Sequence, residues 1–249
     1  MSEAKLSTIT MDEDENNDNI LVIKDLTKIF PHPSDPHTKI PILSGVNQKF
    51  TFNQLNFLMG ASGSGKSTFI RMILGVSPVS AGEISFKNYS IHKLHIMKYS
   101  IRADYWSRIG YVNQFPAKTL CLDLSIKENL SLYQHLGIKK GMLNLEKMNY
   151  AKYLKFFNLS LDLNTPVRKL SGGEIQRLNL ACVLIKLPKL ILCDEPTSQL
   201  DYENKINIIN ILEKYRELNN ACVLITTHNE EITRNHKLFI LKNGKIQEI

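Results

Sequence analysis

The sequence predicts an α/β fold: a parallel sheet around a phosphate-binding loop, flanked by an antiparallel β subdomain and interrupted by a helical insertion. Three observations predict it. Residues 57–59 are apolar and lead directly into the glycine-rich segment GASGSGKST at residues 60–68. Residues 190–193 and 222–225 are continuous apolar runs, which are typical of buried parallel strands. Short strand-like segments before and just after the glycine-rich segment predict the second, β-rich part.

The composition is that of an ordinary globular protein, with 43% hydrophobic and 22% charged residues. No apolar run reaches the ~18 residues that a membrane-spanning helix needs. The N-terminus lacks the charged-then-apolar pattern of a secretion signal. The four cysteines have no metal-ligand spacing, so we expect buried free thiols in a reducing compartment.

Charge is unevenly spread along the chain. Six acidic residues and one lysine give residues 1–19 a charge of −5, so the net charge of +7 leaves +12 for the rest. The polar, acidic composition predicts that residues 1–19 are a disordered tail and that residues 20–249 form a single domain. The basic part has no block of positive charge interleaved with aromatic residues, so nucleic acid is not an expected partner.

The β-rich part comes first. Its first strand is expected to begin at residues 20–23, and the prolines of PHPSDPH, residues 31–37, predict a loop after it. Residues 41–52 are expected to form further strand with a turn at residues 44–45. Another short strand is expected at residues 83–87, beyond the glycine-rich segment.

A helical insertion is expected next. Residues 108–114 should form a strand that ends at Gln114. Ser125, three residues before a glutamate, predicts a capping box at the start of a helix, which Gly137 should end. A second helix has one apolar face, formed by Met148, Ala151, Leu154 and Phe157. We therefore expect residues of about 115–169 to form a helical insertion between core strands.

Two further helices are expected around the first buried run. One starts at Ser171, stops before Pro188 and has an apolar face, formed by Ile175, Leu178, Cys182 and Ile185. The other begins at Asp201, whose side chain should cap its first turn. After the second buried run, residues 238–249 are expected to form a hairpin that turns at the Asn-Gly pair of residues 243–244.

The glycine-rich segment matches the pattern G-x-x-x-x-G-K-[ST] between a strand and a helix, which is the context of a phosphate-binding loop. Glycines let the backbone wrap around a polyphosphate, and the N–H groups of a helix N-terminus attract it. Lys66 would reach the β- and γ-phosphates, and the Ser67 hydroxyl would ligate Mg²⁺. The alternative is an accidental glycine-rich turn. The predicted nucleotide-binding residues of this loop are Gly60, Ala61, Ser62, Gly63, Ser64, Gly65, Lys66, Ser67 and Thr68.

Two carboxylates follow the first buried run. Asp194 comes directly after four apolar residues, at the carboxyl edge of a parallel sheet, where it could hold Mg²⁺ through water. Glu195 is next and points elsewhere, so it could polarise an attacking water molecule. The alternative is an acidic turn after a strand.

The segment Ser171, Gly172 and Gly173 also fits a phosphate contact. Serine supplies a hydroxyl, and two glycines at a helix N-terminus expose backbone N–H groups to an anion. The alternative is a simple helix cap. A cap needs the serine but not the two glycines, which weaken a helix.

These motifs, in this order, resemble those of an ATP-binding cassette (ABC) ATPase. The resemblance covers residues 20–249, and its most specific motif is LSGGE at residues 170–174. It implies a P-loop NTPase fold with an antiparallel β subdomain and a helical subdomain, and hydrolysis of ATP with Mg²⁺. It also implies two such domains packed head to tail, with ATP between the phosphate loop of one and the LSGGE segment of the other.

The resemblance implies further roles. Gln114 would contact Mg²⁺ and the attacking water and relay the state of the insertion, and His228 would contact the γ-phosphate. Asp201 would lie in the loop that passes between the two chains. Phe30, expected just after the first strand, takes the place of an aromatic residue that stacks on adenine, most often tyrosine. Glu195, His228 and Gln114 are thus the expected catalytic residues, and the expected metal-binding residues are Ser67, Gln114 and Asp194.

Two positions depart from the usual family pattern. Glu174 stands where glutamine is commonest, and Gln199 replaces a small residue. Neither change removes a catalytic group, so we expect an active ATPase.

The chain has one cassette and no membrane domain, which implies a subunit that powers a separate membrane permease from its cytoplasmic face. Residues 166–177 are similar to those of lipoprotein-release and macrolide-export ATPases, although amino-acid importers share most of them. The alternative is a soluble cassette that acts as an assembly factor, as in iron–sulfur cluster biogenesis. The expected partners are a second copy and a permease; the transported substrate is not indicated.

Overall fold

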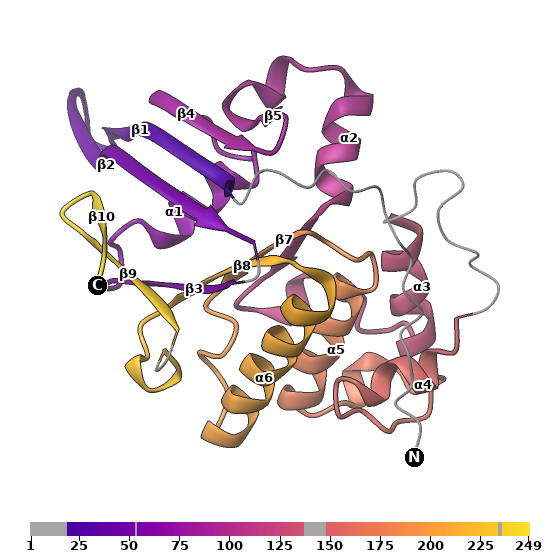
Figure 1. Cartoon of the computed structure of the whole chain (residues 1–249). Helices are drawn as coiled ribbons and strands as arrows, with labels where there is room; N and C mark the ends of the chain where they lie inside the picture. The colour runs from indigo at the N-terminus through magenta and orange to yellow at the C-terminus, as the bar shows by residue number, and fades with distance from the viewer. Residues whose placement is uncertain (1–18, 53, 137–147, 234–235) are drawn as a thin grey trace.

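The computed structural model describes residues 19–52, 54–136, 148–233 and 236–249. The predicted tail before Asn19 and the predicted helix end at Gly137 lie outside these residues. Two sheets and their covering helices make up the described chain (Figure 1). Within it, no helix is long and apolar enough to cross a membrane.

The larger sheet has the order β10-β9-β3-β8-β7-β6, and its neighbouring strands are parallel except for the hairpin β9–β10. Every residue of β7 and β8 is buried, as the continuous apolar runs predicted. The Asn-Gly turn of the final hairpin is also confirmed, because both turn residues have positive φ, at 50° and 72°. The bounds are β3 Gln54–Met59, β6 Ile109–Val112, β7 Leu190–Asp194, β8 Cys222–Thr227, β9 Lys237–Lys242 and β10 Lys245–Glu248.

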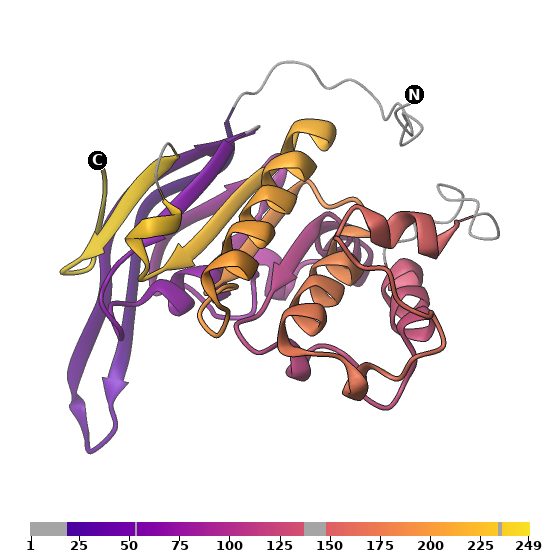
Figure 2. The same cartoon turned by 90° about the horizontal axis from the view of Figure 1, so that it is seen from below.

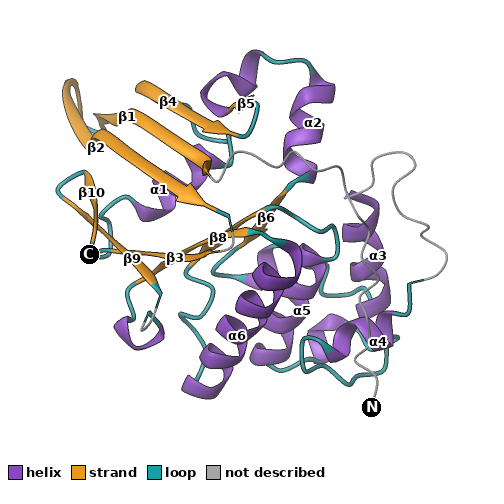
Figure 3. Cartoon of the chain, viewed as in Figure 1, coloured by secondary structure: helices purple, strands orange, loops and turns teal. Residues whose placement is uncertain are grey.

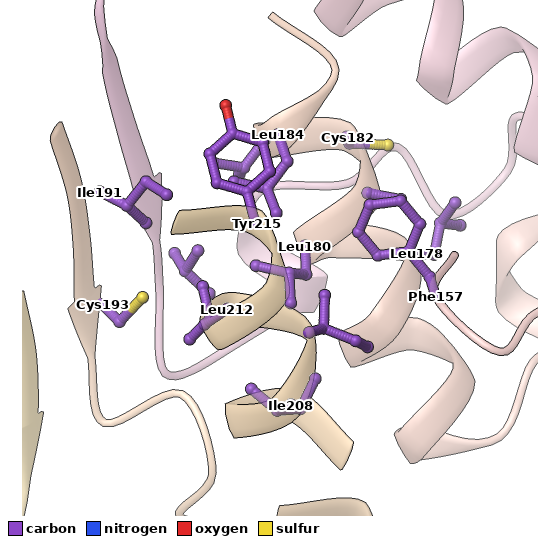
Figure 4. Close-up of a cluster of buried hydrophobic side chains, with 14 of the residues drawn as sticks. Phe157, Leu178, Leu180, Cys182, Leu184, Ile191, Cys193, Ile208, Leu212 and Tyr215 are labelled. Carbon is purple, nitrogen blue, oxygen red and sulfur yellow. The ribbon is translucent and has the colours of Figure 1, made fainter. Parts of the chain in front are cut away.

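Helices cover both faces of this sheet (Figure 3). Alternate residues of β7, such as Ile191 and Cys193, pack in one apolar cluster with α5 (Gly172–Leu184) and α6 (Tyr202–Asn219), as Figure 4 shows. The intervening residues pack in a second cluster with α1 (Lys66–Ile73) and the smaller sheet. The carboxyl ends of β7 and β8 therefore meet the start of α1 at one edge of the sheet.

The smaller sheet is antiparallel, with the order β2-β1-β4-β5. The predicted loop at residues 31–37 is too long, because only residues 33–34 form a turn. β1 (Asn19–His32) and β2 (Asp35–Thr51) form one long hairpin that projects from the body (Figure 2). β1 pairs with β4 (Ala81–Phe86) only as far as Thr27. Beyond Thr27 the ribbon has only two strands. Pro31, which has no N–H to donate, therefore leaves no third strand without a hydrogen bond. β5 is Tyr89–Ser90.

The predicted turn at residues 44–45 is wrong. Both residues lie within β2, where Gly45 takes a positive φ of 59° and the register with β1 shifts nearby. Because glycine adopts this conformation without strain, it bends the strand without ending it.

Between β6 and α5 the described chain contains the helices α3 (Ile126–Leu136) and α4 (Tyr150–Lys155) and two single turns of 3₁₀ helix. The capping box is confirmed: Glu128 Oε2 accepts the Ser125 N–H at 2.8 Å, and Ser125 Oγ accepts the Glu128 N–H at 3.3 Å. α3 packs on α5 through the cluster that also faces the sheet.

Some elements differ from the prediction. α2 (Tyr99–Ser107) was not predicted, because its sequence has little amphipathic pattern and only Tyr105 of it is buried. The other described helical segments are short 3₁₀ helices, Ile91–Ile96 and Glu230–Ile232. Three of the four cysteines are buried free thiols as expected, but Cys121 is exposed at the start of the helical segment.

Candidate active site

The phosphate loop joins β3 to α1 and passes close to two other strands. A Cβ atom on Gly65 would lie 2.6 Å from Cγ2 of Ile42 in β2, and Gly65 has a positive φ of 107°. A Cβ atom on Gly60 would lie 2.7 Å from the carbonyl oxygen of Leu241 in β9. Both positions therefore require glycine, which lets the loop pass close to these two strands.

Lys66 is buried and lies back across this loop. Its Nζ atom donates to the carbonyl oxygens of Gly60 at 2.7 Å and Ala61 at 3.1 Å, and it is 3.7 Å from Oε1 of Glu195. The ammonium charge is thus held between the loop and a carboxylate. This is the position from which it can neutralise phosphate oxygens held by the loop.

Ser67 and Asp194 are brought together from sequence positions far apart. Ser67 Oγ donates to Asp194 Oδ1 at 3.0 Å, and Asp194 is buried at the end of β7. A hydroxyl and a carboxylate next to a phosphate loop are hard oxygen donors of the kind that Mg²⁺ prefers, so the residues fit this ion. Gln114 follows the neighbouring strand β6, and its amide donates to Ser198 Oγ at 3.2 Å.

Glu195 leaves the strand in a left-handed conformation, with a φ of 48° that non-glycine residues seldom adopt. Its Oε1 atom lies 3.7 Å from Lys66 Nζ, and its Oε2 atom lies 3.3 Å from Nδ1 of His228, which is exposed at the end of β8. The carboxylate therefore lies between the phosphate-loop lysine and a histidine. A carboxylate in this position can take a proton from a water molecule that attacks a phosphate.

The segment at residues 170–174 forms the start of α5, where Ser171 is the N-cap of a second capping box. Glu174 Oε2 accepts the Ser171 N–H at 2.8 Å and its hydroxyl at 2.7 Å, and these hydrogen bonds lower the pKa of Glu174. Glutamate thus serves where glutamine is usual, because either residue can close a capping box.

The two glycines of this segment have different surroundings. A Cβ atom on Gly172 would meet nothing within 4 Å, whereas one on Gly173 would lie 2.8 Å from Oδ1 of Asn204 in α6. Glycine at position 173 therefore allows close packing against Asn204, and a larger residue would displace that side chain. Gly172 has no such reason, and its backbone is open to an outside ligand.

Asp201 caps α6 as predicted, accepting the N–H of Asn204 at 2.9 Å. Asn204 also accepts a hydrogen bond from Arg177 of α5, and Gln176 of α5 donates to the carbonyl of Pro196 at 2.6 Å. The starts of α5 and α6 are thereby tied to the loop after Glu195. Within the described residues, no hydrogen bond or ion pair joins residues 171–173 to the phosphate loop at residues 60–68.

Phe30 lies inside β1 and not after the first strand, because β1 is longer than predicted. Phe30 is 39% exposed, so part of it is accessible to a ligand. Lys28, two residues earlier on the same face, places its Nζ atom 4.6 Å from the ring centroid and donates to the carbonyl of Pro78 at 2.6 Å.

The family model described as ABC transporter matches residues 43–198, more than half of the chain. The chain belongs to the ABC transporter family. Among its relatives is the lipoprotein-releasing system ATP-binding protein LolD of Blochmanniella floridana, 31% identical over 209 residues, which cover 84% of this chain and 86% of that protein. The putative hemin import ATP-binding protein HrtA of Staphylococcus epidermidis ATCC 12228 is 30% identical over 229 residues, which cover 91% and 98%.

Solved structures agree with this assignment. The dimeric structure of the cassette MJ0796 in a post-hydrolysis state, bound to ADP and Pi, superposes with a TM-score of 0.78 at 27% identity and covers 92% of this chain and 98% of that one. The protein is thus an ABC ATPase with the P-loop NTPase fold, and it converts ATP and water to ADP and phosphate.

Sequence reasoning assigned no role to several residues that contact the candidate site residues: Lys28, Arg177, Ser198, Asn204 and Thr226. Each makes a contact with a segment distant in sequence, which no local pattern predicts. Thr226 alone left a signal, because it is a polar residue that directly follows the buried apolar run of β8.

Proposed function

We propose that this ABC ATPase works as a homodimer that sandwiches ATP and powers a separate membrane permease. The observation that carries the proposal is the open backbone at Gly172, at the start of a helix and without a bond to the phosphate loop of its own chain. An exposed helix N-terminus attracts phosphate. The phosphates of ATP held by the phosphate loop of a second chain would therefore bind at this helix start. The MJ0796 structure, which is a dimer with ADP and Pi, supports this arrangement.

In the proposed reaction the phosphate loop and Lys66 hold the β- and γ-phosphates of ATP. Ser67 and Asp194 would hold Mg²⁺, with Gln114 nearby, and the ion would neutralise charge on the phosphates. Glu195 accepts a proton as the water oxygen bonds to the γ-phosphorus and the bond to the bridging oxygen of ADP breaks. His228, whose Nδ1 atom lies 3.3 Å from Glu195 Oε2, would contact the γ-phosphate.

The permease is proposed to dock on the helical insertion of about residues 115–169. Phe115 directly follows Gln114 and is 37% exposed, with Lys118 Nζ 4.7 Å from its ring centroid. Leu132 and Leu136 of α3 are also exposed. Exposed apolar side chains of this kind suit contact with the apolar face of a short amphipathic helix.

A polytopic membrane protein should co-purify with the wild-type chain from a detergent extract, and replacing Phe115 by glutamate should remove it. Basal ATPase activity should stay within about twofold, because exposed substitutions change stability little. Phe115 is a better test than the neighbouring Leu122, which is partly buried against the core. Leu218→Glu is the matched control, because Leu218 is exposed on α6 outside the insertion.

The outcome separates two functions. Loss of a membrane partner in the Phe115→Glu variant alone supports a transporter subunit that sits on the cytoplasmic face of a membrane. A partner without membrane spans would instead support the assembly-factor alternative. Relatives named for lipoprotein release and for hemin import are about equally similar to this chain, so the similarity does not indicate one cargo. In this proposal the permease selects the cargo.

Adenine stacking by Phe30 is part of the proposal. Phe30→Ala should weaken ATP binding about tenfold, because base–aromatic stacking contributes ~1–3 kcal/mol. Phe30→Tyr keeps the ring and should bind ATP like the wild type. Inorganic tripolyphosphate, which lacks a base, should bind all three proteins equally. An alanine variant with wild-type ATP affinity would rule the stacking out.

A further inference from the structure

Thr226 lies at the end of β8, directly opposite Asp194 in the parallel register with β7. Cys222 and Leu224, on the same face of the strand, pack in the apolar cluster that also contains residues of α1. Alternation along the strand therefore predicts an apolar side chain at position 226. The position holds a hydroxyl instead, with an exposed fraction of 0%. A buried hydroxyl is unfavourable unless it is hydrogen bonded, so its contacts indicate why it is there.

The hydroxyl contacts both neighbouring carboxylate residues. Thr226 Oγ1 is 2.9 Å from Asp194 Oδ1 and 3.3 Å from the carbonyl oxygen of Cys193. Its single proton goes to the carboxylate, because that contact is shorter and charge-assisted. The same oxygen accepts the backbone N–H of Glu195 at 3.1 Å, and the Thr226 carbonyl shares that N–H at 3.2 Å.

These bonds form a short chain from the Glu195 N–H through the Thr226 hydroxyl to the Asp194 carboxylate. The negative charge polarises the hydroxyl, which makes its oxygen a better acceptor for the N–H. The N–H belongs to the residue with a φ of 48°, so the chain stabilises the left-handed turn between the two carboxylates. That turn allows Asp194 to meet Ser67 while Glu195 lies between Lys66 and His228.

We propose that Thr226 is a positioning residue of the ATPase site. Its hydroxyl fixes the carboxylate that would hold Mg²⁺ and the carboxylate that would activate water relative to each other. The inference rests on the proposed roles of Asp194 and Glu195 and adds a residue that couples them.

The test compares variants that separate the hydroxyl from the methyl group. Thr226→Val keeps the shape and suits a strand. It should lower kcat about tenfold and weaken ATP binding several-fold in the presence of Mg²⁺, because a hydrogen bond to a charged group is lost. ATP binding without Mg²⁺ should be unchanged, since the phosphate loop is intact. Thr226→Ser should keep wild-type behaviour. Thr233→Val is the matched control, because Thr233 is buried and donates its hydroxyl to the carbonyl of Glu230.

A wild-type kcat and wild-type affinity for Mg²⁺–ATP in Thr226→Val would overturn the proposal. So would equal impairment of the valine and serine variants, because serine keeps the hydroxyl and lacks only the methyl group, so loss of the hydroxyl would not explain the impairment. If the valine variant does not fold, Thr226→Ala against Thr226→Ser makes the same comparison, since both lack the methyl group and only serine keeps the hydroxyl. Wild-type activity in a Glu195→Gln variant would contradict the proposed role of Glu195 as the base. Wild-type activity in Thr226→Val would contradict only the positioning role of Thr226, so the two failures are distinguishable.

Discussion

Glu195→Gln is expected to lower ATP turnover by about a hundredfold or more while ATP still binds. A general base contributes ~10²–10⁴-fold to a reaction rate, and glutamine cannot take the proton. The contact between Ser67 and Asp194 does not involve the Glu195 side chain, and Lys66 keeps its hydrogen bonds to the carbonyls of Gly60 and Ala61, so ATP and Mg²⁺ should still be held. With the γ-phosphate retained, two chains should remain joined, because it contacts both in the proposed sandwich.

The measurement is single-turnover hydrolysis together with light scattering after size-exclusion chromatography. The variant should be a dimer in ATP and Mg²⁺ and a monomer in ADP. Asp194→Asn should form little dimer, because it weakens the metal site. Glu231→Gln, an exposed glutamate near the same edge, should behave as the wild type. Turnover at the wild-type rate in Glu195→Gln would refute the assignment of the base.

Gly172→Arg is expected to abolish the dimer that Glu195→Gln forms with ATP. The structure has open space around this position, so the monomer should tolerate an arginine. In the sandwich the same side chain would fill the space between the helix start and the phosphate loop of the partner. ATP binding to the monomer should be unchanged within about twofold, since the phosphate loop is elsewhere in the chain.

The neighbouring residues are poorer choices for this test. Ser171 caps α5, and a Cβ atom on Gly173 would meet Asn204, so replacing either also perturbs the chain itself. Gly172→Ala is the size control and should still dimerise. A Gly172→Arg variant that dimerises with ATP as well as its parent does would contradict the sandwich.

Local patterns predicted most of the core, for physical reasons. The runs of β7 and β8 are apolar throughout because helices cover both faces of the sheet, and the capping residues Ser125, Ser171 and Asp201 satisfy backbone groups a few residues away. The long β1–β2 hairpin was not predicted, because the prolines of residues 31–37 indicated a loop. The structure accommodates Pro31 in a strand because this part of the ribbon pairs with no third strand. Cys121 was expected to be buried but is exposed.

The site residues could be predicted only where a single local sequence motif contains them. Lys66 belongs to the phosphate-loop motif, and Asp194 and Glu195 come directly after the apolar run of β7. The structure brings the three residues together at one edge of the sheet. The contacts of Thr226 and Asn204 depend on the register of β8 with β7 and on the approach of α5 to α6. Register and helix approach are properties of the folded chain, so sequence patterns alone did not reveal them.

The central claim is that each ATP site is built from two chains, and mixing two inactive variants tests it most directly. Lys66→Met lacks the lysine of the phosphate loop, and Gly172→Arg blocks the helix start that faces the partner. A mixed dimer has one site with both defects and one site with neither. We expect each variant alone to be inactive and an equimolar mixture to hydrolyse ATP. A mixture no more active than its two components would contradict a site shared between chains.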